Sequence, residues 1–428
     1  MDHMLDITIE KMSFGGEGIG YHEGKVIFVD GALPGDRVTV KVYREKKSFA
    51  KATALKLIEH SKDRVPSTCI YSDTCGGCPW MNARYEDQLE WKKSFINSAL
   101  SKIAKLDSFK IDRMIASENR LGYRNRVKLK ARVSKDGKLS LGFFAKQSHK
   151  LVSIDSCKIA DPLIDKAIGW LSKKHLSLTL KQDILTDIEL QVIKPEDPSL
   201  MADISFHPKT PRHQALSHAL TELLRTCPEI SWVSCEGFSP KKRFTYDRQD
   251  QIEFLSSNGE FQQVNLKANH TLRSYIKDLI KAHKPKKVLD LYCGSGNLSL
   301  LCSDTESMII GVESNLESIK TAGQTLEKNN IKGAEYLRAK AEDMGRLLDK
   351  KGPFDFVIVD PPRAGLGEAI AGLMALKASH ICYVSCDPNT LARDIGLLAK
   401  EYNLTEVIGL DFFPQTYHVE TVAYLSRK

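Results

Sequence analysis

The sequence lacks the features of membrane-spanning and secreted proteins. No run of apolar residues approaches the roughly 18 that a bilayer-spanning helix needs. The first residues show no basic stretch followed by an apolar one, so no secretory signal is expected. Internal repeats and low-complexity segments are absent too. These absences predict a cytoplasmic protein with no membrane partner.

What remains is the composition of a folded chain, because 42% of the 428 residues are apolar and 27% are charged. This length predicts two or three domains, each with its own core. The formal net charge of +8 is uneven: residues 37–56 carry +6 and residues 121–150 carry +8, whereas residues 283–428 carry −2. Such concentration favours a polyanionic partner for the first two regions.

Two domains are predicted before residue 261. In residues 1–59, strand-like runs at 7–10, 25–29 and 37–42 alternate with glycine turns, which suits a small OB-like β-barrel. Residues 60–260 mix helical and strand patterns and predict an α+β domain. This segment includes a predicted helix near 85–105, for which packing on the third domain is an alternative to packing within the second.

A basic strand is expected inside the second domain. From position 124 to 132, cations alternate with other residues, and a period of two places them on one face of a strand. The predicted RNA contacts are Arg124, Arg126, Lys128, Lys130 and Arg132. One such lysine indicates only a solvated face, but nine cations against one acid in thirty residues favour a nucleic-acid surface.

Residues 261–428 are predicted to form the third domain. Short apolar runs at 288–291, 308–312, 356–359 and 381–384 alternate with helical stretches. This rhythm is typical of a Rossmann-like, doubly wound α/β domain with a largely parallel sheet.

A cofactor pocket is expected at the end of the strand at 288–291. Gly294, Gly296 and Asn297 form a glycine turn there, and Glu313 ends the next strand. Glycines let the backbone approach a nucleotide, and the acid can accept hydrogen bonds from ribose hydroxyls. The third glycine of a dinucleotide fingerprint is missing, which disfavours pyrophosphate and favours S-adenosylmethionine.

A nucleophile and a base are expected at the same edge. Cys386 ends the strand at 381–384, directly before a helix N-terminus that favours thiolate. Thiolate addition to carbon 6 of uracil would make carbon 5 nucleophilic toward a methyl sulfonium, and a base must then remove the proton on carbon 5. Glu420 and His418 are the candidate bases.

These motifs together resemble the S-adenosylmethionine-dependent RNA (uracil-5-)-methyltransferases, in the branch with an N-terminal TRAM domain and an iron–sulfur cluster. The shared motifs are QVN (263–265), DLYCGSGN (290–297), DPPRAG (360–365), SCDPNTLARD (385–394) and FPQTYHVE (413–420). The resemblance implies Cys386 as nucleophile and Glu420 as proton acceptor. It implies a cofactor site made of Gln263, Tyr292, Gly294, Gly296, Asn297, Glu313 and Asp360.

Two departures from related patterns matter. The segment around Lys340 lacks the small polar residue expected near the adenine, so no contact is assigned there. The loop at Pro361-Pro362 lacks the cysteine usual in enzymes that methylate carbon 5 of cytosine, which favours uracil.

The expected substrate is a flipped-out uridine of 23S rRNA, and the expected protein is a monomer. The alternatives are a tRNA uracil or an RNA cytosine as target, and a non-catalytic RNA-binding protein.

A metal site is predicted from four cysteines, namely Cys69, Cys75, Cys78 and Cys157. Four thiolates suit either zinc or an iron–sulfur cluster, and the spacing alone leaves both open. The resemblance implies a 4Fe-4S cluster with a structural or RNA-positioning role. Cys227, Cys235, Cys302 and Cys382 are expected to be inert.

Overall fold

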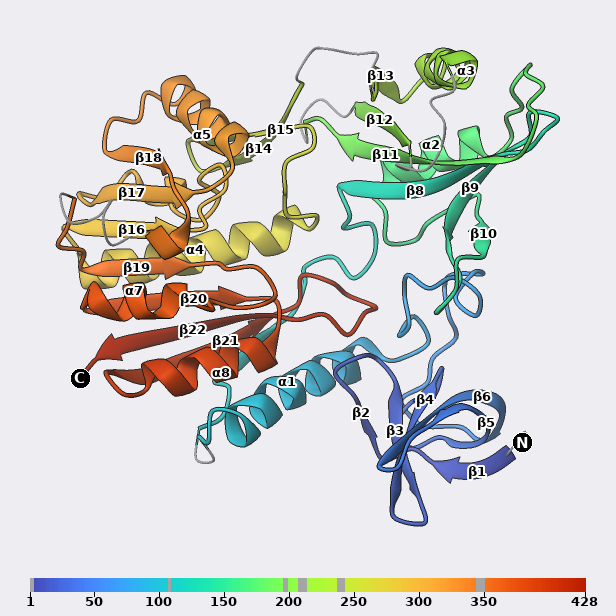
Figure 1. The fold of residues 1–428 in the computed structure, drawn as a ribbon, viewed down its shortest axis with the longest axis horizontal. Helices are drawn as coiled ribbons and strands as arrows, with labels where there is room; N and C mark the ends of the chain where they lie inside the picture. Colours follow the sequence, from blue (N-terminus) through green and yellow to red (C-terminus); the bar gives the residue numbers. More distant parts are fainter. Residues whose placement is uncertain (1–3, 107–108, 195–198, 207–213, 237–242, 344–350) are drawn as a thin grey trace.

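The computed structural model describes residues 4–106, 109–194, 199–206, 214–236, 243–343 and 351–428 (Figure 1). No helix in these ranges is both long and apolar enough to cross a membrane.

The N-terminal sheet confirms the predicted small β domain. Its six strands are β1 (Met4–Thr8), β2 (Lys11–Met12), β3 (Gly18–His22), β4 (Lys25–Asp30), β5 (Arg37–Glu45) and β6 (Phe49–Glu59), hydrogen-bonded in the order β1-β5-β6-β4-β3-β2. Alternate side chains such as Ile27, Val29, Val38 and Val40 point inward and form one apolar core. The sheet curls so that β1 also contacts β3.

The central sheet carries the basic strand. Its strands are β8 (Arg126–Val133), β9 (Leu139–Phe144), β10 (Leu151–Ser153), β11 (Ile184–Val192), β12 (Leu200–Phe206) and β13 (Ile230–Cys235), in the order β10-β9-β8-β11-β12-β13. Helices α2 (Pro162–Leu171) and α3 (Gln214–Arg225) pack on it, as the predicted α+β composition requires. A separate hairpin of β14 (Phe244–Gln249) and β15 (Ile252–Ser257) leads to the last part of the chain.

The C-terminal sheet confirms the doubly wound α/β prediction. Its strands are β16 (Lys287–Leu291), β17 (Met308–Glu313), β18 (Ala334–Arg338), β19 (Phe356–Val359), β20 (His380–Ser385), β21 (Tyr402–Leu410), β22 (Glu420–Arg427) and β7 (Arg113–Ile115). The order is β18-β17-β16-β19-β20-β22-β21-β7. Strands β16 to β20 are parallel, and β22 is antiparallel to both of its neighbours. The strand order reverses between β16 and β19.

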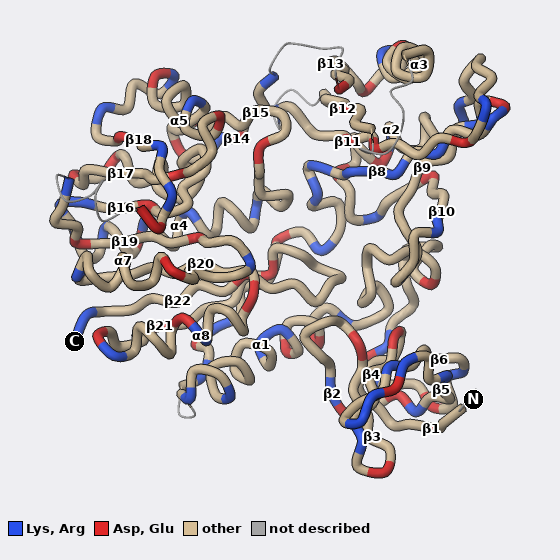
Figure 2. Tube along the Cα trace, viewed as in Figure 1, with Lys and Arg blue, Asp and Glu red and all other residues tan. Residues whose placement is uncertain are grey.

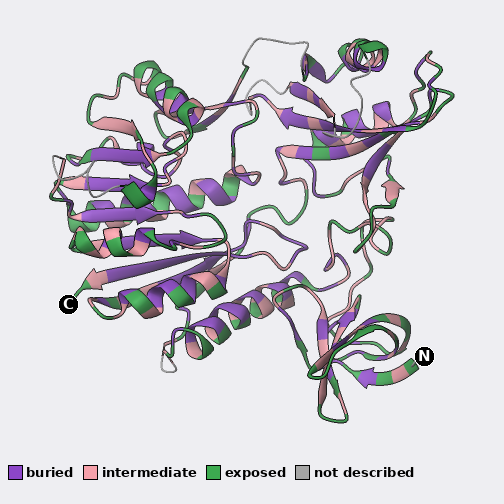
Figure 3. Ribbon diagram, viewed as in Figure 1, coloured by how far each residue is buried: buried purple, intermediate pink, exposed green. Residues whose placement is uncertain are grey.

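Helices cover both faces of this sheet. One face packs against α4 (Leu266–His283), and α5 (Leu316–Lys328) contacts β17 and β18. The opposite face packs against α1 (Tyr85–Lys102), α7 (Ala369–Ala375) and α8 (Pro388–Leu398). Figure 3 accordingly shows the strands as mostly buried and α1 as alternating between buried and exposed residues.

The segment before the central sheet therefore packs on the C-terminal sheet. Helix α1 lies against α8, and β7 pairs with β21 at the sheet edge (Figure 1). The helix expected near 85–105 is present, and its packing partner is the third domain. The division of the chain at residues 59 and 260 stays a prediction.

Candidate active site

The candidate site lies where the parallel strands of the C-terminal sheet end. Tyr292 follows β16, Glu313 ends β17, Asp360 follows β19 and Cys386 follows β20. Carboxyl ends of parallel strands meet at one sheet edge, and the reversal of strand order opens a crevice there. The topology thus brings together the four motifs predicted from the sequence.

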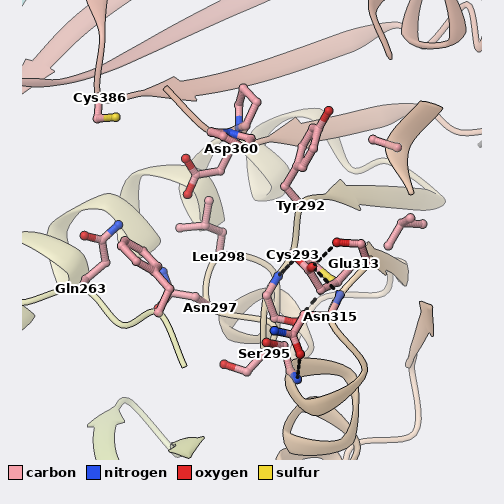
Figure 4. A pocket seen from close by; sticks show the side chains of 18 of the residues that line it. Gln263, Tyr292, Cys293, Ser295, Asn297, Leu298, Glu313, Asn315, Asp360 and Cys386 are labelled. Atoms are coloured by element: carbon pink, nitrogen blue, oxygen red, sulfur yellow. Dashed lines mark hydrogen bonds between the residues drawn. The ribbon is translucent and has the colours of Figure 1, made fainter. Parts of the chain in front are cut away.

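A cavity of about 1240 Å³ opens at this edge. Of the predicted residues, its lining includes Gln263, Tyr292, Gly294, Asn297, Glu313, Asp360, Cys386 and Glu420. Figure 4 shows Cys386 at one end of the pocket, Glu313 at the other, and Asp360 and Tyr292 between them. Lys340, to which no contact was assigned, also lines the cavity.

The two glycines of the turn differ in what surrounds them. Gly294 has φ +55°, and a Cβ added there would meet no atom within 4 Å, so a ligand can approach its backbone closely. Gly296 has φ +86°, and a Cβ there would lie 2.6 Å from Leu300. Gly296 therefore faces the protein interior, and its predicted cofactor contact finds no support in the lining of the cavity.

The Glu313 carboxylate is hydrogen-bonded to the backbone of its own turn and of the glycine turn. Its carboxylate accepts hydrogen bonds from the backbone N–H of Asn315 at 2.7 Å and of Gly294 at 3.3 Å. These bonds fix the carboxylate at the cavity wall, and its remaining lone pairs can accept ribose hydroxyls.

Asn297 is held by residues that sequence reasoning missed. Arg273 of α4 donates to the Asn297 side-chain oxygen at 2.6 Å, and Asn269 exchanges hydrogen bonds with the same amide. The Arg273 side chain is 3% exposed and also pairs with Asp247 at 2.6 Å. The sequence gives no sign that Arg273 is buried, because charged residues are common in amphipathic helices. Only the fold shows which acid such a residue contacts.

Cys386 lies in a strongly charged neighbourhood. Burial and the nearby Glu420 carboxylate raise the pKa of the Cys386 thiol to about 11, and the Arg363 guanidinium opposes that shift. Burial and the charge of Asp360 raise the pKa of Glu420 well above its usual range. Burial raises the pKa of Asp360 to about 7. A thiol, two basic carboxylates and one cation therefore act on each other in one cavity.

His418 is the other candidate base, and the structure makes it a poor one. Burial, together with the positive charges of Arg363 and Lys92, lowers the pKa of His418 to about 4. Its ring packs edge-on against Phe413, with centroids 5.8 Å apart. A weakly basic imidazole is neutral at pH 7 and holds a proton less readily than Glu420.

The four predicted metal ligands share a second cavity, of about 180 Å³. Cys69, Cys75, Cys78 and Cys157 all line it, all are half-buried, and none forms a disulfide. Burial raises the pKa of Cys75, Cys78 and Cys157. The sequence prediction that these four thiols converge is consistent with this arrangement.

The donor set consists of four thiols, which both zinc and iron–sulfur clusters use as ligands. In the part of the chain that the structure describes, no three His, Cys, Asp or Glu side chains approach one point at metal-ligand spacing. A single zinc ion would need four sulfurs about 2.3 Å from one centre. An iron–sulfur cluster takes four thiolates as well, so the thiols by themselves leave both groups open.

Arg124 differs from the other predicted RNA contacts. It precedes β8 and lines the cysteine cavity, and its Nε is buried without a hydrogen-bond partner. Strand β8 begins at Arg126, so it contains four of the five cations and Arg124 lies before it. The alternation itself is confirmed from Arg126 to Val133, where Val127, Leu129, Ala131 and Val133 are buried.

Acids of the neighbouring strand pair with the four remaining cations. Asp187 of β11 lies 3.4 Å from Lys128 and 2.6 Å from Lys130. Asp183 lies 2.7 Å from Arg132, and Glu189 lies 3.9 Å from Arg126. The blue cations along β8 in Figure 2 are thus largely compensated. RNA contact by these residues stays a prediction.

Comparison with known proteins assigns the fold and the site to a family. A model of the tRNA (uracil-5-)-methyltransferase family matches residues 84–428. The chain belongs to the tRNA (uracil-5-)-methyltransferase family. A TRAM domain model matches residues 4–55, which confirms the TRAM assignment made from the resemblance.

Relatives in this family match nearly the whole chain. An RNA methyltransferase of Listeria innocua is 30% identical and covers 99% of this chain and 97% of the relative. The 23S rRNA (uracil(1939)-C(5))-methyltransferase RlmD of Shewanella piezotolerans is 31% identical over 98% of this chain and 95% of its own.

A solved structure agrees with the whole fold. It is the tRNA (uracil-54, C5)-methyltransferase of Pyrococcus abyssi in complex with S-adenosyl-L-homocysteine. It is 26% identical, has a TM-score of 0.74, and covers 98% of this chain and 100% of its own. The recognition of the family and the enzyme class, an S-adenosylmethionine-dependent RNA (uracil-5-)-methyltransferase, are confirmed.

Proposed function

We propose that this enzyme transfers the methyl group of S-adenosylmethionine to carbon 5 of a uridine in 23S rRNA. The observation that carries the proposal is the meeting of Cys386, Glu420 and Asp360 in one cavity with the glycine turn. The relative named for 23S rRNA, which matches along nearly all of both chains, supports the choice of rRNA.

Cys386, Glu420 and Arg363 each take a part in the reaction. The Cys386 thiolate attacks carbon 6 of the uracil and breaks the double bond between carbons 5 and 6, which places electron density on carbon 5. Carbon 5 then takes the methyl group from the sulfonium of S-adenosylmethionine. Glu420 removes the proton from carbon 5, and the electrons of that C–H bond expel the Cys386 thiolate. Arg363 stabilises the thiolate before attack and after release.

Glu420 suits proton removal because its carboxylate is kept out of water. Its side chain is 4% exposed, and its raised pKa makes the deprotonated form a stronger base than an ordinary glutamate. The target base must leave its stack to reach Cys386, as in other enzymes that modify bases.

The enzyme assay compares wild type with Cys386→Ala. RNA is incubated with methyl-labelled S-adenosylmethionine, digested to nucleosides and analysed for 5-methyluridine. We expect 5-methyluridine with wild type and a loss of at least a thousandfold with Cys386→Ala. Full activity of Cys386→Ala would exclude the covalent mechanism, and labelled 5-methylcytidine would exclude uracil as the target base.

A tRNA target is the second candidate, because the solved relative is named for tRNA. Transcripts of 23S rRNA segments and of tRNAs are methylated side by side. Replacement of uridine by 5-fluorouridine in the better substrate should trap a covalent enzyme–RNA adduct, because fluorine cannot leave as a proton does. Faster methylation of the tRNA transcripts would replace rRNA by tRNA in the proposal.

We propose further that Cys69, Cys75, Cys78 and Cys157 hold a 4Fe-4S cluster. The four thiols line one cavity of about 180 Å³, and four thiolates are the ligand set of such a cluster. When bound, it would tie the segment of Cys69–Cys78 to that of Cys157. No step of the methyl transfer requires an electron, so its role is structural or RNA-positioning.

The cluster is tested by metal analysis after anaerobic purification. We expect about four iron and four sulfide per chain, with broad visible absorbance that Cys157→Ser abolishes. Cys227→Ser is the matched control, since Cys227 is buried in the apolar core of the central sheet and should leave the iron content unchanged. Stoichiometric zinc without iron would replace the cluster by a zinc site.

A further inference from the structure

Helix α1 turns polar side chains toward the interior of the protein. Along its buried face, the first half carries Tyr85, Gln88 and Lys92, whereas the second half carries Ile96 and Leu100. Gln88 and Lys92 are both 0% exposed. Buried polar groups require partners, and Gln88 and Lys92 both find partners in the segment of residues 411–419, which leads into Glu420.

Lys92 meets a carboxylate from the far end of the chain. Its ammonium donates to the Asp411 carboxylate at 2.5 Å and to the Phe413 carbonyl at 3.1 Å. Asp411 also accepts the backbone N–H of Phe413 at 3.1 Å. This buried ion pair therefore fixes the first turn of the segment.

Gln88 holds the middle of the same segment. Its side-chain oxygen accepts the backbone N–H of Gln415 at 2.9 Å, and its amide nitrogen donates to the Gln415 side chain at 3.0 Å. Gln415 has φ +70°, a left-handed conformation that a residue with a side chain adopts only when its surroundings enforce it. The two hydrogen bonds between Gln88 and Gln415 are part of that enforcement.

Four successive carbonyls of the segment are bound by four different parts of the protein. The donors are Asn265 to Phe412 O, Lys92 to Phe413 O, Tyr123 to Pro414 O and Trp80 N–H to Gln415 O, each at 3.1 Å. Hydrogen bonds to four successive carbonyls restrict the conformations that this part of the loop can adopt.

The segment forms a wall of both cavities. Phe413 and His418 line the cavity of Cys386 as well as the cysteine cavity, and Thr416 lines the latter. The next residue after the segment is Glu420, which begins β22. The position of the Glu420 carboxylate relative to Cys386 thus depends on how residues 411–419 are held.

We propose that Gln88 and Lys92 are positioning residues for proton removal, acting by holding residues 411–419 so that Glu420 faces the substrate carbon. This proposal rests on the proposed function of Glu420. Neither side chain touches the cavity of Cys386. A displacement of about 1 Å at a reacting group can cost about a hundredfold in rate, so loss of these contacts should slow one chemical step.

The test uses Gln88→Met and the double variant Lys92→Met/Asp411→Asn in the full-length enzyme. The second combination avoids an unpaired buried carboxylate, and both keep the side-chain volumes. In single-turnover reactions we expect the release of methylated RNA from Cys386 to slow by about 10- to 100-fold. The affinity for S-adenosylmethionine should change less than twofold. The covalent enzyme–RNA adduct should accumulate, because Cys386 still attacks but Glu420 removes the proton slowly.

Two control variants separate positioning from general loss of stability. Lys93→Met makes the same lysine-to-methionine substitution at the next position of α1, and Leu100→Ala weakens the packing of the same helix away from the segment. Neither should accumulate adduct. Hydrogen exchange of residues 411–420 should become at least tenfold faster in Gln88→Met and stay unchanged, relative to other protected segments, in Leu100→Ala.

The outcomes distinguish this proposal from the proposed function. If the wild type forms no 5-methyluridine on any RNA, the proposed function fails, and the exchange measurement still reports whether Gln88 holds the segment. If the wild type is active and Gln88→Met releases product at the rate of Lys93→Met, the positioning role is overturned. An equal adduct in Leu100→Ala overturns it as well.

Discussion

The reactivity of Cys386 is set by charges that the surrounding protein fixes around it. Burial and Glu420 raise its pKa to about 11, so the thiol form dominates at neutral pH. Arg363 is the nearby cation that shifts the balance back toward thiolate. A thiol with a high pKa gives a strongly nucleophilic thiolate once it is deprotonated. The thiol form that dominates before substrate binds is less readily oxidised than a thiolate.

Substitution of Arg363 should make Cys386 harder to ionise. In Arg363→Gln the pKa of the thiol rises, because the stabilising charge is removed while Glu420 and Asp360 remain. Below that pKa the thiolate fraction grows about tenfold per pH unit, so alkylation by iodoacetamide at pH 8 should slow several-fold. The profile of alkylation rate against pH should move to higher pH.

Lys340→Gln is the matched control for this measurement. Lys340 is a cation that lines the same cavity, but it does not contribute to the shift at Cys386. Its substitution should leave the alkylation profile in place. An unchanged or faster rate in Arg363→Gln would show that Arg363 does not stabilise the thiolate.

At the scale of single elements, the two basic regions of the chain differ in how their charge is used. The cations of β8 face acids of β11 and its preceding residue, as the ion pairs of Lys130 and Arg132 show. In the TRAM domain, Arg44 and Lys47 are exposed at the end of β5 and the turn after it. At β8, phosphates of RNA would compete with protein carboxylates for the cations. At the hairpin of β5 and β6 this competition is weaker.

RNA binding should therefore depend more on the hairpin than on β8. In Arg44→Gln/Lys47→Gln we expect weaker binding, and the slope of log affinity against log salt should fall by roughly 1.5, as for two lost phosphate contacts. Lys128→Gln/Lys130→Gln makes the same change of charge and should alter the slope by less than half as much. Fluorescence anisotropy with one RNA over a salt series measures both.

A further variant tests the pairing directly. Asp187→Asn releases Lys128 and Lys130 and should steepen the salt dependence. A larger loss of slope from the β8 double variant than from the hairpin variant would restore β8 as the principal phosphate-binding strand.

The sequence predicted those elements whose signal is local. The strands before Tyr292, Asp360 and Cys386 are apolar runs that end in motif residues, and their parallel arrangement brings those motifs to one edge. The role of α1 was beyond prediction, because Gln88 and Lys92 look like solvated polar positions until the fold places Asp411 and Gln415 against them. The compensation of β8 was missed for the same reason, since its acids come from a strand some fifty residues later.

At the scale of the whole molecule, the C-terminal sheet is completed by residues that precede the central sheet. β7 forms its edge beside β21, and α1 covers part of one face. The predicted boundary at residue 260 therefore does not by itself enclose a complete core.

A fragment of residues 261–428 should fail to fold cooperatively. It would leave the α1 side of the sheet exposed and the Asp411 carboxylate buried without Lys92, and loss of one partner of a buried pair costs about 3–5 kcal/mol. A fragment of residues 84–428, the range of the family model, retains these contacts and should fold. Circular dichroism during urea unfolding compares the two, and a cooperative transition in the shorter fragment would contradict the expectation.

The contact between Gln88 and Gln415 also has a consequence for the order in which the protein is made. The two residues are 327 positions apart. At about 5–20 residues per second, α1 leaves the ribosome roughly 15 s to a minute before its partner segment is synthesised. The buried partner of Lys92, Asp411, is made equally late. Glu420 also belongs to the last strand of the chain, so the reactive site can be complete only after nearly the whole chain has been synthesised.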